Sequence, residues 1–369
     1  MPKWEKMTVG DLCDTISDTY RGDDKDVVLI NTSDVLEGKV LNHQVVENKN
    51  LKGQFKKTFK ENDILYSEIR PANKRYAFVD FGDTNNYIAS TKLMVLRPRK
   101  EVVRPRFLFS FLASKSVLEE LQQLAETRSG TFPQITFSSE LAPTPINVPD
   151  LETQDRIVGI LDVIEEKIST NAEINKNLAD QTQAIYQQYF VAEANPDWPL
   201  GHLSDLIDIK YGKDHKKLAD GTYPVYGSGG IMRYVERPLY EKESVLIPRK
   251  GTLNNVIYVN QPFWSVDTMF YTEMKQDNVA KFVYHYVKSK DLASMNAGSA
   301  VPSMTTAILN ALELPLPSIE ALKHFEVSVA PMYEMMQKNE EESHKLAKLR
   351  DALLPKLMSG GIDVSALSL

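Results

Sequence analysis

Four short stretches of this sequence concentrate side chains that can form paired hydrogen bonds with a ligand. Arginine, lysine, asparagine and glutamine contact nucleic-acid phosphates and base edges in this way. For each stretch taken alone, a solvated surface loop is the simpler interpretation, so a function requires an architecture that organises them. Their members are Arg70, Lys74 and Arg75; Arg128, Ser129, Thr131 and Gln134; Lys213, His215, Lys216 and Lys217; and Arg249, Lys250, Thr252, Asn254 and Asn255.

Paired carboxylates and a lysine also occur, in an order that resembles a metal-dependent nuclease signature. Pro149-Asp150 is followed by Glu165-Glu166-Lys167. In such a nuclease the second carboxylate and the lysine lie on a strand beside the metal. Here they fall between Ile164 and Ile168, inside a helical pattern. A nuclease function therefore remains a minor alternative, which metal-dependent DNA cutting by the isolated chain would support.

Other signatures of catalysis or cofactor binding are incomplete. The stretch Asn195-Pro196-Asp197-Trp198 lacks the second proline of the Asn-Pro-Pro-aromatic loop of amino-methyltransferases. The stretch Gly227-Ser228-Gly229-Gly230 lacks the third glycine of a dinucleotide loop, since Met232 occupies that position. The six histidines show no metal-ligand spacing, and the single cysteine, Cys13, excludes an intramolecular disulfide. We predict no catalytic residue, no metal site and no cofactor in this chain.

A helical segment that occurs twice is the element best able to position the polar stretches. Residues 149–190 and 317–358 align without a gap at a constant shift, which carries Pro149 onto Pro317. Two ordinary amphipathic helices in a bundle are the alternative, but an ungapped match of this length favours duplicated helices that pack on each other. Further identical pairs are Glu152/Glu320, Asn171/Asn339, Glu173/Glu341, Leu178/Leu346, Ala179/Ala347 and Ala184/Ala352.

The apolar residues of both copies follow alternating steps of four and three, the seam of a coiled coil. Each helix would be roughly 60 Å long at about 1.5 Å per residue. The middle of each seam is polar, and its asparagines could either be buried to set the register or lie in a splayed, hydrated segment. The seam runs through Ile157, Leu161, Ile164, Ile168, Asn171, Asn175, Leu178, Thr182, Ile185 and Tyr189, and through Phe325, Val329, Met332, Met336, Asn339, Ser343, Leu346, Arg350, Leu353 and Leu357.

The regions before the helices also repeat, since the pattern that begins at Trp4 returns at Trp198. Both contain short strand-like runs and one helix, predicted from Arg106 to Glu126 and from Val279 to Lys290. We expect an α/β (α+β) fold with a pseudo-two-fold internal duplication, in which two globular domains are joined by two long helices that pack on each other as a coiled coil. The domains are residues 1–148 and 191–316, and the helical segments are 149–190 and 317–369, the latter with a C-terminal tail.

Composition and charge restrict the function further. The chain has 369 residues and a net charge of −7, and no apolar run is long enough to span a membrane. Residues 149–190 hold three basic and eight acidic side chains, while both globular regions are nearly neutral. A domain that binds DNA unaided is usually basic, so a lone DNA-binding protein is disfavoured. Without a secretory leader, a cytoplasmic location is expected.

The combination of motifs resembles the specificity subunit of bacterial type I restriction–modification enzymes. The likeness covers essentially the whole chain, and its motifs are specific only in combination. Gly361 departs from the pattern, since many relatives carry an acidic residue there. Besides the duplicated layout, it is carried by the segments Ile146-Asn147-Val148-Pro149, Tyr223-Pro224-Val225-Tyr226-Gly227-Ser228-Gly229-Gly230, Arg249-Lys250-Gly251-Thr252, Phe263-Trp264-Ser265-Val266-Asp267-Thr268 and Leu354-Pro355-Lys356-Leu357-Met358-Ser359-Gly360.

The resemblance implies a function that agrees with the near-neutral domains. Each globular domain would be a target-recognition domain for one half of a split site in double-stranded DNA, and the four polar stretches, with Tyr226 and Ser228, would contact the DNA. The two helices would pack as an antiparallel coiled coil, a spacer that fixes the gap between the half-sites. Two methyltransferase subunits would dock on this spacer, and restriction/motor subunits would join. S-adenosylmethionine would bind the methyltransferase subunits, not this chain. The alternative is a coiled-coil interaction scaffold without DNA recognition.

Overall fold

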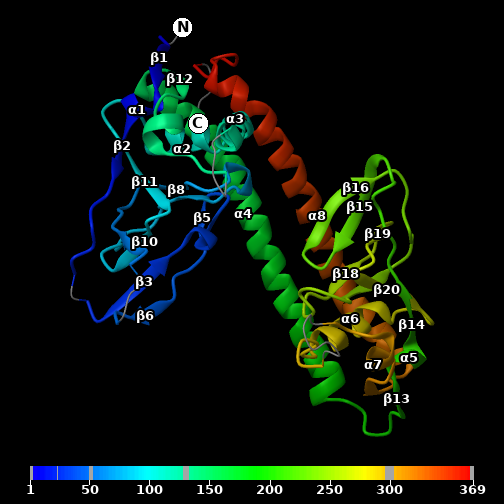
Figure 1. Cartoon of the computed structure of the whole chain (residues 1–369). Coiled ribbons are helices and arrows are strands. Elements are labelled where there is room, and N and C mark those ends of the chain that lie inside the picture. The colour runs from blue at the N-terminus through cyan, green and yellow to red at the C-terminus, as the bar shows by residue number, and fades with distance from the viewer. Residues whose placement is uncertain (1–2, 23, 50–52, 128–132, 296–302, 366–369) are drawn as a thin grey trace. The chain divides into compact units, whose positions relative to one another are not determined.

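The computed structural model describes residues 3–22, 24–49, 53–127, 133–295 and 303–365. It divides into two compact units. Unit 1 comprises Met1–Asn171 and Glu341–Leu369, and unit 2 comprises Ala172–Glu340. Both boundaries fall inside the long helices α4 (Leu151–Gln187) and α8 (Ile319–Met358), so each unit contains part of both helices (Figure 1).

Equivalent residues cap the starts of the two long helices. The Asp150 carboxylate accepts a hydrogen bond from the Thr153 backbone N–H (2.9 Å), and the Ser318 hydroxyl accepts one from Ala321 (3.2 Å). These bonds satisfy backbone donors that a helix leaves unpaired in its first turn. The bond from Thr153 also lowers the pKa of Asp150. Both helices therefore begin where the sequence repeat places them.

Pro355 lies near the end of α8, where a proline can kink or end a helix. The helix continues to Met358. Leu354 and Leu357 are buried in the core of unit 1 and hold this last turn in place. The helix stops at Gly360, whose positive φ of 72° is a conformation that glycine adopts without strain.

Unit 1 places two four-stranded sheets beside a short strand pair. The strand orders are β6-β3-β10-β7 and β2-β11-β8-β9, and β1 pairs with β12. The elements are β1 (Glu5–Thr8), α1 (Val9–Leu12), β2 (Cys13–Ile16), β3 (Asp26–Ile30), β4 (Val35–Leu36), β5 (Lys39–Val40), β6 (Val45–Glu47), β7 (Phe55–Lys57), β8 (Ile64–Ser67), β9 (Tyr76–Phe78), β10 (Tyr87–Ser90), β11 (Leu93–Pro98), α2 (Pro105–Leu112), α3 (Lys115–Thr127) and β12 (Pro145–Val148), with short helical turns η1 (Thr32–Asp34), η2 (Pro71–Asn73) and η3 (Phe137–Leu141).

The single helix predicted from Arg106 to Glu126 is wrong, because the structure divides it into α2 and α3. The division falls at Ala113 and Ser114. The Ser114 N–H bonds to the Phe111 carbonyl in a tighter turn, and the Ser114 carbonyl then accepts the first bond of α3 from Leu118. The apolar periodicity continues across this break, which is why it suggested one helix.

Unit 2 repeats this layout. Its sheets have the orders β14-β20-β17-β18 and β16-β15-β19, and β13 pairs with β21. The elements are η4 (Gln188–Ala192), β13 (Leu200–His202), α5 (Leu203–Leu206), β14 (Ile207–Tyr211), β15 (Asp220–Gly227), β16 (Gly230–Val235), β17 (Ser244–Pro248), β18 (Ile257–Val259), β19 (Trp264–Ser265), β20 (Met269–Met274), α6 (Ala280–Lys288), α7 (Thr306–Asn310) and β21 (Glu313–Pro315). The expected internal duplication of mixed helix-and-strand domains is thus present.

The long helices run antiparallel in each unit, and their seam residues are buried or half-buried. In unit 1, Ile157 and Leu161 of α4 share a core with Leu354 and Leu357 of α8. In unit 2, Tyr186 of α4 packs with Phe325 and Val329 of α8. Ile164 is also buried, and the half-buried seam residues are Ile168, Leu178, Ile185, Met332, Met336, Leu346 and Leu353.

The polar middle of the seam forms hydrogen bonds between the helices. In unit 1, Asn171 Nδ2 donates to Glu342 Oε2 (2.8 Å) and to Ser343 Oγ (3.2 Å). In unit 2, Asn175 Nδ2 donates to the Met336 carbonyl (2.9 Å), and Asn339 Nδ2 donates to Asn175 Oδ1 (2.8 Å). Of the two interpretations left open by the sequence, this geometry favours asparagines that set the register.

Short helices attach each globular region to a long helix through ion pairs. In unit 1, Arg106 of α2 pairs with Asp162 of α4 (2.8 Å). In unit 2, Lys281 of α6 pairs with Glu326 of α8 (2.6 Å). The unit 1 pair is partly exposed, whereas the Lys281 side chain is almost fully buried. Loss of Lys281 should therefore destabilise the protein more than loss of an exposed lysine.

A buried histidine in unit 2 predicts a dependence of stability on pH. His285 is 1% exposed, with Nδ1 2.8 Å from Gln183 Oε1 and Nε2 2.9 Å from the Tyr333 hydroxyl. Burial, and to a lesser degree the charge of Lys288, lower the pKa of His285 from 6.5 to about 3. Below pH 6.5 the unfolded chain therefore binds a proton that the folded chain does not bind until about pH 3.

We expect this contribution to be complete above pH 6.5 and lost progressively as the pH falls toward 3. Between pH 7 and pH 5, wild type should lose about 2 kcal/mol more unfolding free energy than His285→Gln. Denaturant unfolding at both pH values measures this difference. The exposed histidine variant His324→Gln is the control and should keep the wild-type slope. Equal slopes in wild type and His285→Gln would contradict the prediction.

Candidate nucleic-acid interface

The loop after β17 in unit 2 is held on two sides by backbone hydrogen bonds. The Arg249 N–H donates to the Thr268 carbonyl (2.9 Å), and the Arg249 carbonyl accepts from Met304 (2.9 Å). Gly251 follows with a φ of +87°, and a Cβ there would also lie 2.6 Å from Ser228 Oγ. Both the backbone conformation and the close approach of Ser228 therefore favour glycine at this position.

Side chains join the same loop to the β15–β16 turn. Asn255 Nδ2 donates to the Ser228 carbonyl (2.8 Å). Tyr226, just before this turn, is buried, and its hydroxyl accepts a bond from Gln261 Nε2 (3.4 Å). Asn254 is anchored by Asp291, whose Oδ1 accepts from Asn254 Nδ2 (3.1 Å). These predicted DNA-binding residues thus organise the loops through contacts inside the protein.

Lys213 lies beside the segment that the Arg249 loop contacts. Its N–H donates to the Ser265 carbonyl (2.8 Å), and its carbonyl accepts from Trp264 Nε1 (2.8 Å). A Cβ on the preceding residue, Gly212, would lie 2.0 Å from the Val266 carbonyl oxygen, so only glycine allows this crossing. Residues 265–268 are therefore flanked by Lys213 on one side and by Arg249 and Lys250 on the other.

The remaining predicted residues of unit 2 are mostly on the surface. Lys216, Lys217, Lys250 and Thr252 are exposed, as is Lys213. His215 is half-buried, and its Nδ1 has no hydrogen-bond partner among the described residues. The structure thus brings Lys213, Ser228, Arg249 and Lys250 into one neighbourhood of unit 2, whereas among the described residues no hydrogen bond joins Lys216 or Lys217 to it.

A loop of the same design follows β8 in unit 1. The Glu68 N–H donates to the Lys92 carbonyl (3.0 Å), and the Glu68 carbonyl accepts from Ile135 (2.8 Å). Ile69 forms an isolated bridge with Gln134, as Lys250 does with Ser303. Arg70 has a φ of +46° at the position that Gly251 occupies in unit 2. The backbone is duplicated while the side chains differ, with Glu68 in the place of Arg249.

The predicted residues of unit 1 are also divided between internal and exposed positions. Arg75 donates to the Ser33 carbonyl (3.0 Å), and Lys74 pairs with Glu37 (2.7 Å). Arg70 and Gln134 are exposed on adjacent segments, since the Arg70 N–H donates to the Pro133 carbonyl. Arg128, Ser129 and Thr131 lie outside the described residues.

Sequence reasoning missed an aromatic residue in the unit 2 neighbourhood. The Arg249 guanidinium lies 5.5 Å from the ring centre of Tyr211, a cation–π arrangement, and its Nη1 donates to the Asp267 carbonyl (3.1 Å). Tyr211 is half exposed at the end of β14. The only sequence signal is its place in Tyr211-Gly212-Lys213, where glycine marks a close backbone approach.

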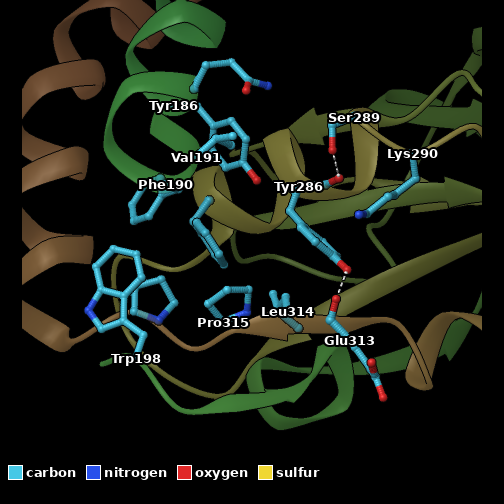
Figure 2. A pocket seen from close by; sticks show the side chains of 13 residues that line it. Tyr186, Phe190, Val191, Trp198, Tyr286, Ser289, Lys290, Glu313, Leu314 and Pro315 are labelled. Carbon is cyan, nitrogen blue, oxygen red and sulfur yellow. Dashed lines mark hydrogen bonds between the residues drawn. The ribbon is translucent and has the colours of Figure 1, made fainter. Parts of the chain in front are cut away.

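A separate cavity of about 200 Å³ in unit 2 has the character of a packing gap (Figure 2). Aromatic side chains from the ends of α4 and α6 surround it, including Tyr186, Phe190 and Tyr286. The Tyr286 hydroxyl donates to the Glu313 carbonyl (2.7 Å), so its polar end is already satisfied.

Among the described residues, no group of three or more His, Cys, Asp or Glu side chains could hold a metal ion. None of the described helices is long and apolar enough to cross a membrane.

Comparison with known proteins identifies this architecture. The profile of the family described as "Type I restriction modification DNA specificity domain" matches residues 1–179 and 195–338. The chain is 28% identical to the type I restriction enzyme HindI specificity subunit of Haemophilus influenzae, over 98% of this chain and 100% of the relative. It is 21% identical to the MjaIX specificity subunit of Methanocaldococcus jannaschii, over 73% and 71% of the two chains.

A solved structure shares the fold. The crystal structure of the S subunit of a type I restriction–modification system from Mycoplasma genitalium superposes with a TM-score of 0.58. It is 20% identical in sequence, and the match covers 97% of this chain and 96% of that one. The likeness spans both globular regions and both long helices, and it supports the two-domain, two-helix fold expected from the sequence.

Proposed function

The chain belongs to the type I restriction–modification DNA specificity family, and we propose that each of its globular regions reads one half of a split, asymmetric DNA site. As a specificity subunit it is the DNA-recognising, non-catalytic part of a larger enzyme. The region before α4 would read one half-site, and the region between α4 and α8 the other. The long helices would set the gap between them.

The duplicated loop is the observation that carries this proposal. Glu68 and Arg249 occupy equivalent backbone positions. Their N–H groups donate to the carbonyls of Lys92 and Thr268, and their carbonyls accept from the N–H groups of Ile135 and Met304. The Glu68 side chain pairs with Lys92 (3.5 Å), whereas the Arg249 side chain lies over Tyr211. The two loops share one backbone arrangement but carry side chains of opposite charge, as expected of two domains that read different DNA sequences.

The charge distribution supports the proposal that partner proteins contribute contacts to the DNA. Neither globular region is basic overall, while phosphate contacts dominate the affinity of proteins that bind DNA alone. We propose that two methyltransferase subunits dock on the helices, supply most phosphate contacts and bind S-adenosylmethionine, and that restriction/motor subunits join for cleavage. No cofactor is assigned to this chain. We propose a cytoplasmic location, where the complex would meet its DNA substrate.

Substitution of one loop residue tests whether the two globular regions read different half-sites. Arg249→Ala should weaken or broaden recognition of one half-site only, by about 10- to 100-fold in affinity for the preferred bases. The matched variant Glu68→Ala, at the equivalent position of unit 1, should alter only the other half-site. Methylation profiles of the assembled enzyme on randomised sites would measure both effects.

Equal losses at both half-sites in Arg249→Ala would show that this residue acts in folding or in general phosphate binding. Loop variants that change stability alone would favour the interaction scaffold. Thermal unfolding of each variant separates these outcomes, because a correctly folded Arg249→Ala protein should melt close to wild type. Only a half-site change without a stability change supports the proposed role.

A further inference from the structure

The β15–β16 hairpin of unit 2 presents two consecutive apolar side chains to solvent. In a regular strand, neighbouring side chains point to opposite faces. In β16, however, Ile231 is 49% exposed and Met232 is 60% exposed. Figure 1 shows this hairpin, in light green, as a two-stranded ribbon whose β16 strand forms one edge of the sheet β16-β15-β19.

A β-bulge interrupts the strand pairing at these two residues. Val225 pairs with Arg233 and Tyr226 pairs with Ile231, so Met232 is an extra residue without a partner on β15. A bulge of this kind re-aims one side chain and increases the local twist. The neighbouring pair Gly227 and Gly230 closes a two-residue turn, and Gly230 has a φ of +109°. The exposed pair therefore lies directly beside the hairpin tip.

Met232 is positioned by the glycine opposite it. A Cβ on Gly227 would lie 2.6 Å from Met232 Sδ, so the thioether rests directly on the Gly227 backbone. Glycine in a strand often marks such a close approach. The Met232 side chain is thus supported on one side while most of its surface remains accessible.

The hairpin is joined to the basic loop. Asn255 Nδ2 donates to the Ser228 carbonyl in the hairpin turn (2.8 Å), and Gly251 packs against Ser228 Oγ. This contact places Ile231 and Met232 near the loop that carries Arg249 and Lys250. Apolar side chains flanked by cations are complementary to the major groove of a DNA duplex, where thymine methyl groups lie between two phosphate backbones.

Unit 1 has the same feature on the equivalent strand. Strand β6 pairs antiparallel with β3, which is parallel to β10, just as β16 pairs antiparallel with β15, which is parallel to β19. Here too the edge strand exposes two consecutive apolar residues, Val45 at 56% and Val46 at 36%. Four exposed apolar side chains on matching edges of two diverged domains indicate a shared use.

We propose that the β15–β16 hairpin enters the major groove of the second half-site and that Ile231 and Met232 contact thymine methyl groups there. This inference rests on the proposed recognition function. A two-stranded ribbon fits the width of the major groove, and a methyl contact distinguishes thymine from the other bases. The side chains supply apolar contact, while Lys250 and Lys213 lie where they can meet phosphates.

Replacement of thymine by deoxyuridine tests the inference, since it removes only the C5-methyl group. The recognised sequence is first obtained from a methylation map. The assembled methyltransferase complex is then titrated with duplexes in which thymines of the second half-site are replaced one at a time. Wild type should lose about fourfold in affinity at one or more positions, the value of one buried methyl group. Met232→Ala should bind the thymine duplex about as weakly and no longer distinguish the two bases at the position that Met232 contacts.

Leu200→Ala is the matched control, because Leu200 is also an exposed apolar residue of unit 2 but lies on β13, away from the hairpin and the long helices. It should keep the wild-type discrimination. Equal wild-type affinity for all duplexes, or a second half-site without thymine, would overturn the inference. So would a Met232→Ala variant that assembles poorly yet still discriminates, because the hairpin would then bind a protein. A map without any split motif would instead refute the proposed recognition function itself.

Discussion

Removal of one heptad from each long helix should shorten the recognised gap by about three base pairs and leave both half-sites unchanged. Residues 171–177 of α4 and 336–342 of α8 are the segments to delete, because Asn175 contacts Met336 and Asn339 between them. Seven residues correspond to about 10 Å of helix, and one base pair to about 3.4 Å of duplex. Methylation at the original sites should be lost.

Both deletions preserve the seam. Leu178 takes the place of Asn171, three residues after Ile168, and Ser343 takes the place of Met336. A same-length control, Asn175→Leu with Asn339→Leu, removes the polar contact without changing the helix length and should keep the original gap. Methylated-site sequencing of each variant measures the gap. A properly folded double deletion that still recognises the wild-type gap would refute the spacer role.

Loss of the buried lysine should have the largest effect on stability. Lys281 Nζ lies 2.6 Å from Glu326 Oε1 and 3.1 Å from Glu243 Oε1, and it faces the rings of Tyr258 and Tyr333. Lys281→Ala leaves the two carboxylates close together without their shared cation. We expect unfolding free energy to fall by about 3 kcal/mol, in the range for one lost partner of a buried pair.

Two variants separate the ion pair from general effects. Lys288→Ala, also on α6 but exposed, should change stability by less than about 0.5 kcal/mol. Lys281→Met with Glu326→Gln and Glu243→Gln removes all three charges and should regain much of the loss, since an uncharged cluster needs no desolvation of charge. Chemical denaturation of the three variants gives the comparison. Equal stability of Lys281→Ala and Lys288→Ala would contradict the buried role.

The long helices could be predicted because their signal is repeated and local. Asp150 and Ser318 begin both helices at equivalent positions, and the seam residues between them are buried or half-buried. The break between α2 and α3 could not be predicted, because the apolar period continues through Ala113 and Ser114. Periodicity shows which face is apolar but not where the backbone bends.

The candidate interface was predictable only in part. Polar clusters identified Lys213, Arg249 and Lys250, yet the sequence could not show that they flank residues 265–268, since strand pairing brings these loops together. The aromatic contact of Tyr211 depends on the same pairing. Met232 lies at a β-bulge, and one extra residue in a strand leaves no clear mark in the sequence.

A genome-wide map of methylated adenines tests the central claim most directly. This chain is co-expressed with its methyltransferase partner in a host without that activity, beside a strain that expresses the partner alone. The proposed function predicts a split, asymmetric motif with a fixed gap that appears only when this chain is present. A stable complex that adds no methylation, or a motif unchanged by removal of this chain, would contradict it.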